Sequence, residues 1–545
     1  MNLCKFLLTR FFLTEKRKSA SLSFVFFFLL NLIMISAQAL DLYTDPETKQ
    51  IFSEPGHGRQ RLGSFVRAED SPAQISEQST VQQPELATIK EELAQKSKEI
   101  ESLENRVKET EKVQPKYGPG LHFESADGNF TAAIDGRFQV DSQYNITNDV
   151  LPATGTALPN ELNSGANIRR ARLGVAGKIY RVWDYKFEFD FSRGNGSVTS
   201  GITDTFLRWS YYDPFSLKIG SFKEPFSLEE ATSNRFLTFI ERNMIANTFV
   251  DNPNTYKTGI GANWNEDRWQ AGIAFQTEPI GSWSTAATSV NPNGNNSRNN
   301  GSGDTGWEVI GRISFLPWWE SNTRFLHIGG SGGHTTVNNQ FRADGQFNNG
   351  GMSFTAFPGT NVDRTNILNT GNLTTGIKGE PGSRQINNYN RYGAEMTMVY
   401  GPFSLQGEYI QTDIYGRGYG GESIWGAYGY ASYFLTGESR NYRAKTGTWN
   451  RIMPNRNLDL KNGGWGAWEI AAGYDFIDLN DGVVRGGKMG AFKIALNWYP
   501  YPNIRMMTNF IHVLNINTSG VADKRSAGFN NADLNMLETR LQIDF

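Results

Sequence analysis

Leu537-Glu538-Thr539-Arg540-Leu541-Gln542-Ile543-Asp544-Phe545 are the last nine residues of the chain, and apolar and polar side chains alternate along them. Successive side chains of a strand point to opposite sides, so the leucines, Ile543 and Phe545 share one face and the charged residues share the other. A half-buried strand of a soluble antiparallel sheet and a membrane strand both show this alternation. The pattern therefore predicts a strand and leaves its surroundings open.

Upstream segments place aromatic residues on one strand face and charges on the other. In Tyr185-Lys186-Phe187-Glu188-Phe189-Asp190-Phe191 the aromatic side chains alternate with charged ones, and residues 130–140 and 492–498 repeat the pattern. Apolar and aromatic side chains facing lipid around a polar interior are typical of an outer-membrane barrel. A final strand that ends on phenylalanine, as here at Phe545, also resembles the assembly signal of bacterial outer-membrane barrels.

The composition agrees with a barrel. After residue 40 no apolar stretch is long enough to cross a bilayer as a helix, whereas glycine (57 residues) and aromatic residues (13%) are plentiful. The formal net charge of −2 gives no overall basic field, which argues against nucleic acid as a partner. We predict an all-β fold, a transmembrane antiparallel β-barrel over residues 121–545.

The N-terminus has the pattern of a secretory signal peptide. Basic residues precede an apolar run from Leu22 to Ile35, which ends at Ala37-Gln38-Ala39. This order predicts a signal peptide over residues 1–39, cleaved after Ala39. The alternative, a single anchoring helix, needs ~20 apolar residues and the run is shorter. Cys4 is the one cysteine and leaves with the signal, which excludes thiolate chemistry in the exported chain.

Two further segments precede the barrel. Residues 40–83 are polar, with scattered Gly, Pro, Ser and Gln, and we interpret them as a flexible leader without a fold. Within residues 84–114 apolar residues recur at three- and four-residue spacings, which predicts a short coiled-coil helix. Lys96 and Thr110 occupy positions of the apolar seam and weaken it, so a solvated amphipathic helix remains an alternative.

Turns and loops in residues 121–545 differ in character. Proline stands among aromatic residues at four places, which predicts tight turns at a membrane interface: residues 211–215, 316–318, 400–403 and 498–503. Long segments rich in Gly, Asn and Ser lie between them, at residues 281–305, 331–390 and 436–464. We assign the turns to the periplasmic rim and the long segments to the outer rim, as barrels are built.

Strand parity predicts which basic side chains line the lumen. If the apolar members of each strand face lipid, then Arg137, Arg170 and Arg172 point inward, while Arg169 formally points outward. A guanidinium is costly in hydrocarbon, so a bulge or a place near the rim must rescue Arg169. The same parity places four more cations inward, namely Lys186, Arg208, Lys218 and Arg312.

Inward arginines attract anions, and the planar guanidinium matches phosphate oxygens. Barrels also fill their lumens with neutral Arg–carboxylate pairs, and acidic residues such as Asp135, Glu188, Asp190 and Asp204 are available here. From the residues alone, an anion site and a structural charge network both remain open.

Several motifs in succession resemble the phosphate-selective porin O and P family. They are Ala166-Asn167-Ile168-Arg169-Arg170-Ala171-Arg172-Leu173-Gly174-Val175, residues 183–191, residues 220–230, Phe239-Ile240-Glu241-Arg242-Asn243, residues 432–440, residues 463–469 and residues 496–500. The resemblance implies a trimeric barrel of sixteen strands with an arginine ladder leading to a constriction made by an inward-folded loop. By motif it assigns Arg137, Arg169, Arg170 and Arg242 to the lumen, with Arg242 on the constriction loop.

The chain departs from the family in its long central loop, where ladder-forming members cluster several arginines. Residues 338–345 contain only Arg342, beside Asp344. This thinning puts strict phosphate selectivity in doubt and leaves anion preference in place. Arg342, with Arg172 and Lys218, completes our set of predicted pore-lining residues.

The sequence predicts a channel and no enzyme. Gly329-Gly330-Ser331-Gly332-Gly333 has the spacing of a nucleophile elbow, but no helical pattern follows it, and the histidines show no metal-ligand spacing. We predict a passive outer-membrane porin for small anions, phosphate-like first, without cofactors and surrounded by outer-membrane lipid. The alternatives are a weakly selective general porin and an envelope tether in which residues 84–114 bind a partner. We favour a clamp for a homotrimer as the role of that helix.

Overall fold

The computed structural model describes residues 40–44, 51–52, 60–65, 91–104, 121–125, 127–150, 161–192, 201–251, 256–277, 306–341 and 344–545. The chain divides into two compact units, residues 1–113 and residues 114–545. The predicted signal peptide and Arg342 lie outside the described residues.

The first unit contains a small antiparallel sheet. Its strands are β1 (Leu40–Thr44), β2 (Ile51–Phe52) and β3 (Gln60–Phe65), in the order β2-β1-β3. Our interpretation of residues 40–83 as a leader without a fold is therefore wrong for these strands. Leu40 and Leu42 alternate with polar residues, but five residues are too short a run to stand out in a polar segment.

Residues 91–104 form a helix in which every side chain is exposed, including Leu93, Ile100 and Leu103. The helix that we expected is thus present over part of residues 84–114, and its pairing as a coiled coil stays a prediction. Among the described residues, no helix combines the length and the apolar character needed to cross a bilayer.

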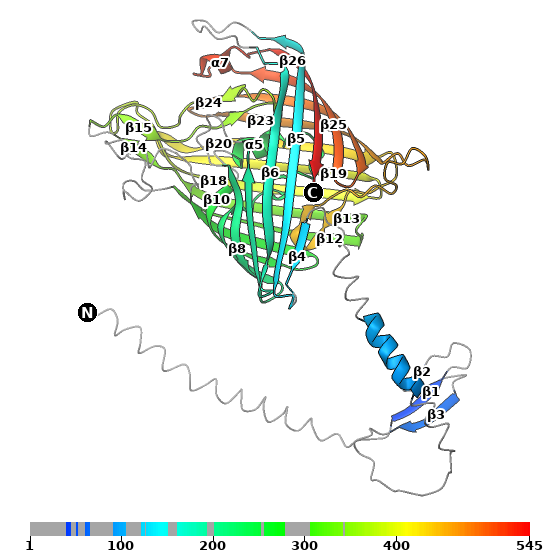
Figure 1. Cartoon of the computed structure of the whole chain (residues 1–545). Coiled ribbons are helices and arrows are strands. Elements are labelled where there is room, and N and C mark those ends of the chain that lie inside the picture. The colour runs from blue at the N-terminus through cyan, green and yellow to red at the C-terminus, as the bar shows by residue number, and fades with distance from the viewer. Residues whose placement is uncertain are drawn as a thin grey trace, which may run out of the picture. The chain divides into compact units, whose positions relative to one another are not determined.

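Residues 121–545 form a closed antiparallel barrel of sixteen strands, which confirms the predicted fold (Figure 1). The strands of its wall are β5 (Phe130–Asp149), β6 (Gly165–Ile179), β7 (Trp183–Asp190), β8 (Ile202–Trp209), β9 (Phe215–Lys223), β10 (Tyr256–Asn265), β11 (Trp269–Thr277), β12 (Trp307–Ser321), β13 (Arg324–Thr336), β18 (Gln385–Tyr400), β19 (Phe403–Arg417), β20 (Tyr419–Phe434), β23 (Ala467–Asp481), β24 (Val484–Tyr501), β25 (Ile504–Asn517) and β26 (Asp533–Asp544).

Shorter elements lie in the connections. They are β14 (Asn339–Phe341), β15 (Phe347–Gly350), β16 (Thr355–Ala356), β17 (Leu368–Asn369), β21 (Tyr442–Arg443), β22 (Thr448–Trp449), α4 (Leu228–Ala231), α5 (Met244–Phe249), η3 (Ala444–Thr446) and α7 (Lys524–Ala527).

The barrel closes where both ends of its sequence meet β5. The last strand, β26, pairs with β5 as far as Asp544 opposite Arg137, and Phe545 exchanges backbone hydrogen bonds with Gly136. A further short strand, β4 (Leu121–Glu124), pairs with the next part of β5. A Cβ on Gly136 would lie 2.3 Å from Cζ of Phe545, so the glycine makes room for the terminal ring.

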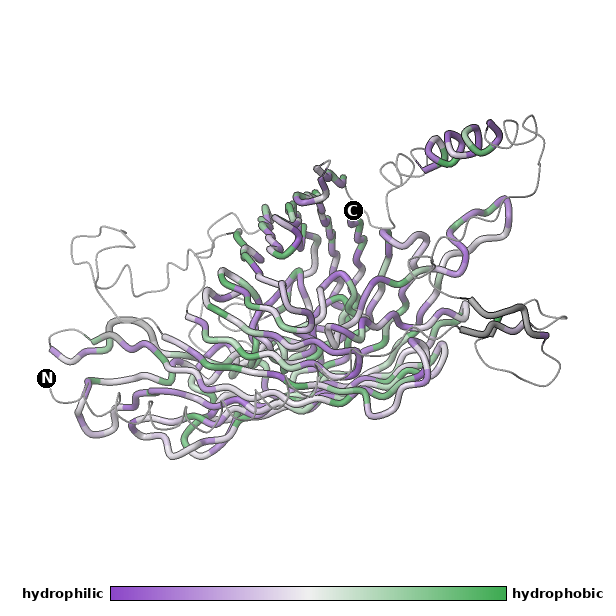
Figure 2. Tube along the Cα trace, turned by 90° about the horizontal axis from the view of Figure 1, so that it is seen from below, coloured by the Kyte–Doolittle hydropathy of each residue, from purple (hydrophilic) through white to green (hydrophobic). Residues whose placement is uncertain are grey.

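Side chains alternate between the two faces of the wall, as the last strand predicts. In β26 Glu538, Arg540, Gln542 and Asp544 are buried in the barrel, whereas Leu541 is exposed on its outside. Figure 2 shows hydrophilic and hydrophobic residues alternating along many of the strands. The polar interior and apolar exterior are those of a barrel that faces lipid.

One end of the barrel carries mostly short turns, for example between β12 and β13 and between β18 and β19. The connection between β20 and β23 leaves from this same end, because β20 runs parallel to β18 and β23 runs parallel to β19. Our assignment of residues 436–464 to the outer rim is therefore wrong. Gly- and Asn-rich composition marks a loop and carries no information about the end from which it leaves.

One of the four predicted turns, at residues 316–318, lies inside a strand, and another, at residues 498–503, begins inside a strand and ends in the turn Pro502-Asn503 between β24 and β25. Pro317 belongs to β12 and Pro500 to β24, and at each the pairing with the next strand shifts register. A proline cannot donate to the ladder, so it is tolerated at such a bulge as well as in a turn. The turns at 211–215 and 400–403 are where we predicted them.

Candidate functional site

The connection between β9 and β10 folds into the barrel and carries α4 and α5. At its start the backbone N–H groups of Leu228 and Glu229 donate to the carboxylate of Glu408 (3.1 and 2.8 Å). At α5 the N–H of Met244 donates to Asp475 (3.0 Å), and Asn243 caps the helix by accepting from Ala246. The carboxylates of two distant wall strands thus hold this connection, which we call the pore loop (described residues 224–251), across the lumen.

A second inward segment comes from the connection between β13 and β18. Phe354, Ala356 and Leu368 have no exposed surface. The segment is tied to the wall where the N–H of Asn361 donates to Glu538 (2.8 Å) and that of Asp363 donates to Gln143 (3.0 Å). These ties bring Arg364 next to the pore loop.

A bulge explains the orientation of the adjacent arginines of β6. Gln139 of β5 pairs with Arg170 and Val140 pairs with Ile168, so Arg169 is the additional residue. A bulge turns two consecutive residues of one strand toward one residue of the other and changes the parity beyond it. Arg169 and Arg170 therefore both reach the interior, and the conflict between strand parity and family motif disappears.

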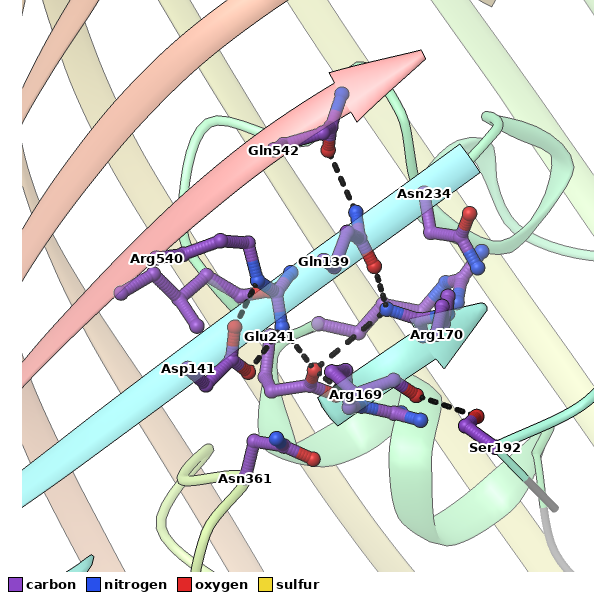
Figure 3. A network of polar contacts seen from close by, with 12 residues as sticks. Gln139, Asp141, Arg169, Arg170, Ser192, Asn234, Glu241, Asn361, Arg540 and Gln542 are labelled. Atoms are coloured by element: carbon purple, nitrogen blue, oxygen red, sulfur yellow. Dashed lines mark hydrogen bonds and ion pairs between the residues drawn. The ribbon is translucent and has the colours of Figure 1, made fainter. Parts of the chain in front are cut away.

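Four guanidinium groups lie within 4 Å of the carboxylate of Glu241 on the pore loop, and Figure 3 shows those of Arg169, Arg170 and Arg540. Arg169 forms two hydrogen bonds to it (2.7 and 3.0 Å), and Arg540 forms one (2.9 Å). Arg364 approaches to 3.3 Å and Arg170 to 3.8 Å. We call these four arginines and Glu241 the central cluster.

The central cluster carries more positive than negative charge. Besides Glu241, Asp141 pairs with this cluster and receives two hydrogen bonds of 2.6 Å from Arg540. Among the described residues four cations thus meet Glu241 and Asp141 directly, and the carboxylates of Glu538 and Asp251 also attract Arg540 and Arg364. Arg364 is 40% exposed and Arg169 16%, whereas Arg170 and Arg540 are nearly or fully enclosed. An ion in the lumen can therefore reach Arg169 and Arg364.

A second group of cations is more nearly neutralised. Arg137 and Arg172 face each other across β5 and β6, and Glu188 lies between them at 3.3 and 2.9 Å. Arg172 also donates to Asp190 (2.8 Å), and Lys186 lies 3.5 Å from Glu188. Without these carboxylates the facing arginines would repel each other.

The other predicted site residues have different surroundings. Lys218 lies between the rings of Phe206 and Phe222, with its ammonium 4.8 and 4.9 Å from their centroids. Arg242 is on the pore loop, as the resemblance implies, but it is buried and binds within the loop, to Glu230 (2.8 Å) and to three backbone carbonyls. Its contacts stabilise the loop and leave its guanidinium out of reach of solvent.

Sequence reasoning missed two members of the central cluster. Arg364 lies in the long central connection, nineteen residues beyond the stretch 338–345 that contains Arg342. Glu241 precedes Arg242 in the quoted motif, but a motif does not state which side chain points into the lumen. Arg540 shares the lumen face with Glu538 and Asp544, as the alternation predicts, and its ion-pair partners are Asp141 and Glu241, which the sequence did not indicate.

Two known proteins are similar to this chain in sequence. The Porin O of Pseudomonas aeruginosa is 27% identical over 413 residues, which cover 72% of this chain and 85% of that protein. An uncharacterized protein of Caulobacter vibrioides is 26% identical over 429 residues, 78% of this chain and 75% of its own length.

Among solved structures, the anion-selective porin from Comamonas acidovorans aligns with 76% of this chain and all of its own, at 11% identity and a TM-score of 0.42. The outer membrane channel DcaP of Acinetobacter baumannii aligns with 78% of this chain and 99% of its own, at 13% identity and a TM-score of 0.39.

The model of the family described as phosphate-selective porin O and P matches residues 138–545, which includes the pore loop, the central cluster and all but the first residues of the barrel. The chain therefore belongs to the phosphate-selective porin O and P family, whose barrels lie in the outer membrane of Gram-negative bacteria.

Proposed function

We propose that the barrel is a passive channel for small anions, phosphate-like oxyanions first, and that the central cluster sets its selectivity. The observation that carries the proposal is the convergence of four arginines on two carboxylates inside the lumen. The family of the chain and the name of its Pseudomonas relative, Porin O, support the same function.

The physical basis is partial replacement of the hydration shell of the ion. An anion that enters the lumen loses water contacts, and guanidinium groups fixed by the wall donate hydrogen bonds in their place. Two opposite unit charges about 4 Å apart attract each other by ~4 kcal/mol at an effective dielectric constant of about 20. A surplus of fixed positive charge thus favours anions and repels cations.

Reversal potentials in planar bilayers test the sign of selectivity. Under a KCl gradient the reversal potential of the purified full-length protein is expected to shift from zero toward the equilibrium potential of chloride. Phosphate added to the same chamber is expected to reduce the chloride current in a saturable way, because both anions use Arg169 and Arg364. A reversal potential on the potassium side overturns the proposal, and a chloride current insensitive to phosphate reduces it to a general anion porin.

We propose the weakly selective porin as the second candidate, because many lumen cations here have carboxylate partners. Glu188 is shared by Arg137 and Arg172, and Glu395 lies 2.5 Å from Arg312. Phosphate block separates the two candidates, as described above. In both, solutes pass without covalent change, so neither requires catalytic residues or a cofactor.

The helix over residues 91–104 supports a proposal about assembly, a clamp for a homotrimer. Its Leu93, Ile100 and Leu103 expose apolar surface that a second copy of the helix would cover. Deletion of residues 84–114 is therefore expected to lower the fraction of trimer in mild detergent, measured by light scattering. Deletion of residues 66–83 is the matched control and should leave the fraction unchanged. A trimer that survives the first deletion would exclude the clamp.

A further inference from the structure

Glu241 occupies the place that an anion would take among the arginines. Its two carboxylate oxygens accept from Arg169 at 2.7 and 3.0 Å, and Arg540 donates to Oε1 at 2.9 Å. Arg364 adds a contact of 3.3 Å to Oε2. A planar pair of oxygens held by several guanidinium groups is also the arrangement in which arginines bind a free oxyanion.

The arginines around Glu241 differ in their other contacts and in their exposure. Arg540 is fully enclosed and also holds Asp141, so its position does not depend on Glu241 alone. Arg169 and Arg364 are the exposed members, and among the described residues Glu241 is the carboxylate that contacts each of them within 4 Å. An incoming anion meets these two arginines first.

We infer that Glu241 is a specificity-determining residue, a tethered carboxylate that competes with permeant oxyanions for Arg169 and Arg364. The inference rests on the proposed function and deepens it. Its location on the pore loop allows this role, because the loop brings a fixed negative charge among arginines that come from the wall and from the second inward segment. Competition of this kind lowers the affinity for phosphate, so that the ion is bound and also released.

The competition explains how a positively charged cluster can bind an anion and still release it. Conduction requires that binding be favourable enough for entry and weak enough for exit. Four arginines without an internal carboxylate would hold a dianion tightly. With Glu241 in place, the departing ion is replaced by a carboxylate that is already within hydrogen-bond distance.

The test is the Glu241→Gln variant of the full-length protein, studied with inorganic phosphate in planar bilayers. Glutamine keeps the shape and one acceptor oxygen, so Arg540 retains a partner. The half-blocking concentration of phosphate is expected to fall at least tenfold, and the chloride preference is expected to rise. Glu241→Asp keeps the charge and shortens the reach, and its half-blocking concentration should lie between those of the other two proteins.

Asp135→Asn is the matched control, because Asp135 is a partly exposed lumen carboxylate that pairs with Arg235 (3.0 Å) outside the central cluster. It should change the half-blocking concentration less than twofold. A wild-type channel that prefers anions, together with an unchanged phosphate block in Glu241→Gln, would overturn the role of Glu241 and leave the proposed function standing. A wild-type channel that prefers cations would overturn both. Heat-modified migration in electrophoresis, which reports barrel folding, is expected to be the same for all variants.

Discussion

Arg540→Ala is expected to destabilise the barrel more than any other single change in the central cluster, by about 3–5 kcal/mol. Arg540 is fully buried, and its guanidinium holds Asp141 through two hydrogen bonds of 2.6 Å and Glu241 through one of 2.9 Å. It also donates to the backbone carbonyl of Ile240. Removal leaves the buried Asp141 without its ion-pair partner and takes away one of the contacts that hold the pore loop against the wall.

Thermal unfolding in detergent, followed by the loss of β-sheet circular dichroism, measures this effect. Arg208→Ala is the control, because Arg208 pairs with Asp184 (3.0 Å) while its side chain is 39% exposed. An exposed pair contributes about 1 kcal/mol or less. Equal melting temperatures for the two variants would contradict the role assigned to Arg540.

Trp449→Ala is expected to release the segment between β20 and β23 from the pore loop, whose Thr232 hydroxyl accepts from the backbone N–H of Trp449 (3.4 Å), and to raise the conductance. Trp449 is 3% exposed. Its ring lies 5.6 Å from that of Tyr442, and Arg440 lies 3.7 Å from the ring centroid. Its indole N–H donates to Gln406 (2.6 Å). Truncation of a buried tryptophan costs about 3–5 kcal/mol.

Single-channel recording measures the result, as a larger or noisier unitary conductance at unchanged barrel folding. Trp465→Ala is the control from the same segment, because Trp465 is 64% exposed. Its conductance should equal that of the wild type. A conductance of Trp449→Ala at the wild-type level would show that this segment does not narrow the pathway.

Strand faces were predictable from sequence, because they depend on a period of two residues within one segment. Glu538, Arg540 and Asp544 lie inside as the terminal alternation predicts, and Arg137, Arg170 and Arg172 follow the same rule. A local pattern is sufficient wherever one face meets water and the other lipid.

Features that depend on pairing between distant segments were not predictable. The sequence left two explanations open for Arg169, a bulge or a place near the rim, and the register of β5 against β6 is needed to choose the bulge. The partner of Arg540 is Asp141, almost four hundred residues away, and the approach of Arg364 to Glu241 needs the path of two loops. For the same reason the origin of residues 436–464 at the short-turn end was missed.

The family resemblance supplied what local patterns could not. It placed Arg169 in the lumen and Arg242 on an inward loop, and both are found there. It did not distinguish their roles, because Arg169 reaches the solvent whereas Arg242 binds within the loop. A motif indicates where a residue lies along the chain, whereas the exposure of its side chain depends on the packing around it.

The central claim is that the exposed arginines of the central cluster bind the permeant oxyanion. The most direct measurement is phosphate block of the chloride current in the double variant Arg169→Ala/Arg364→Ala, with Arg208→Ala as the matched loss of a lumen arginine. This claim predicts that the half-blocking phosphate concentration rises at least tenfold in the double variant and stays near the wild-type value in the control. An unchanged phosphate block in the double variant would contradict it.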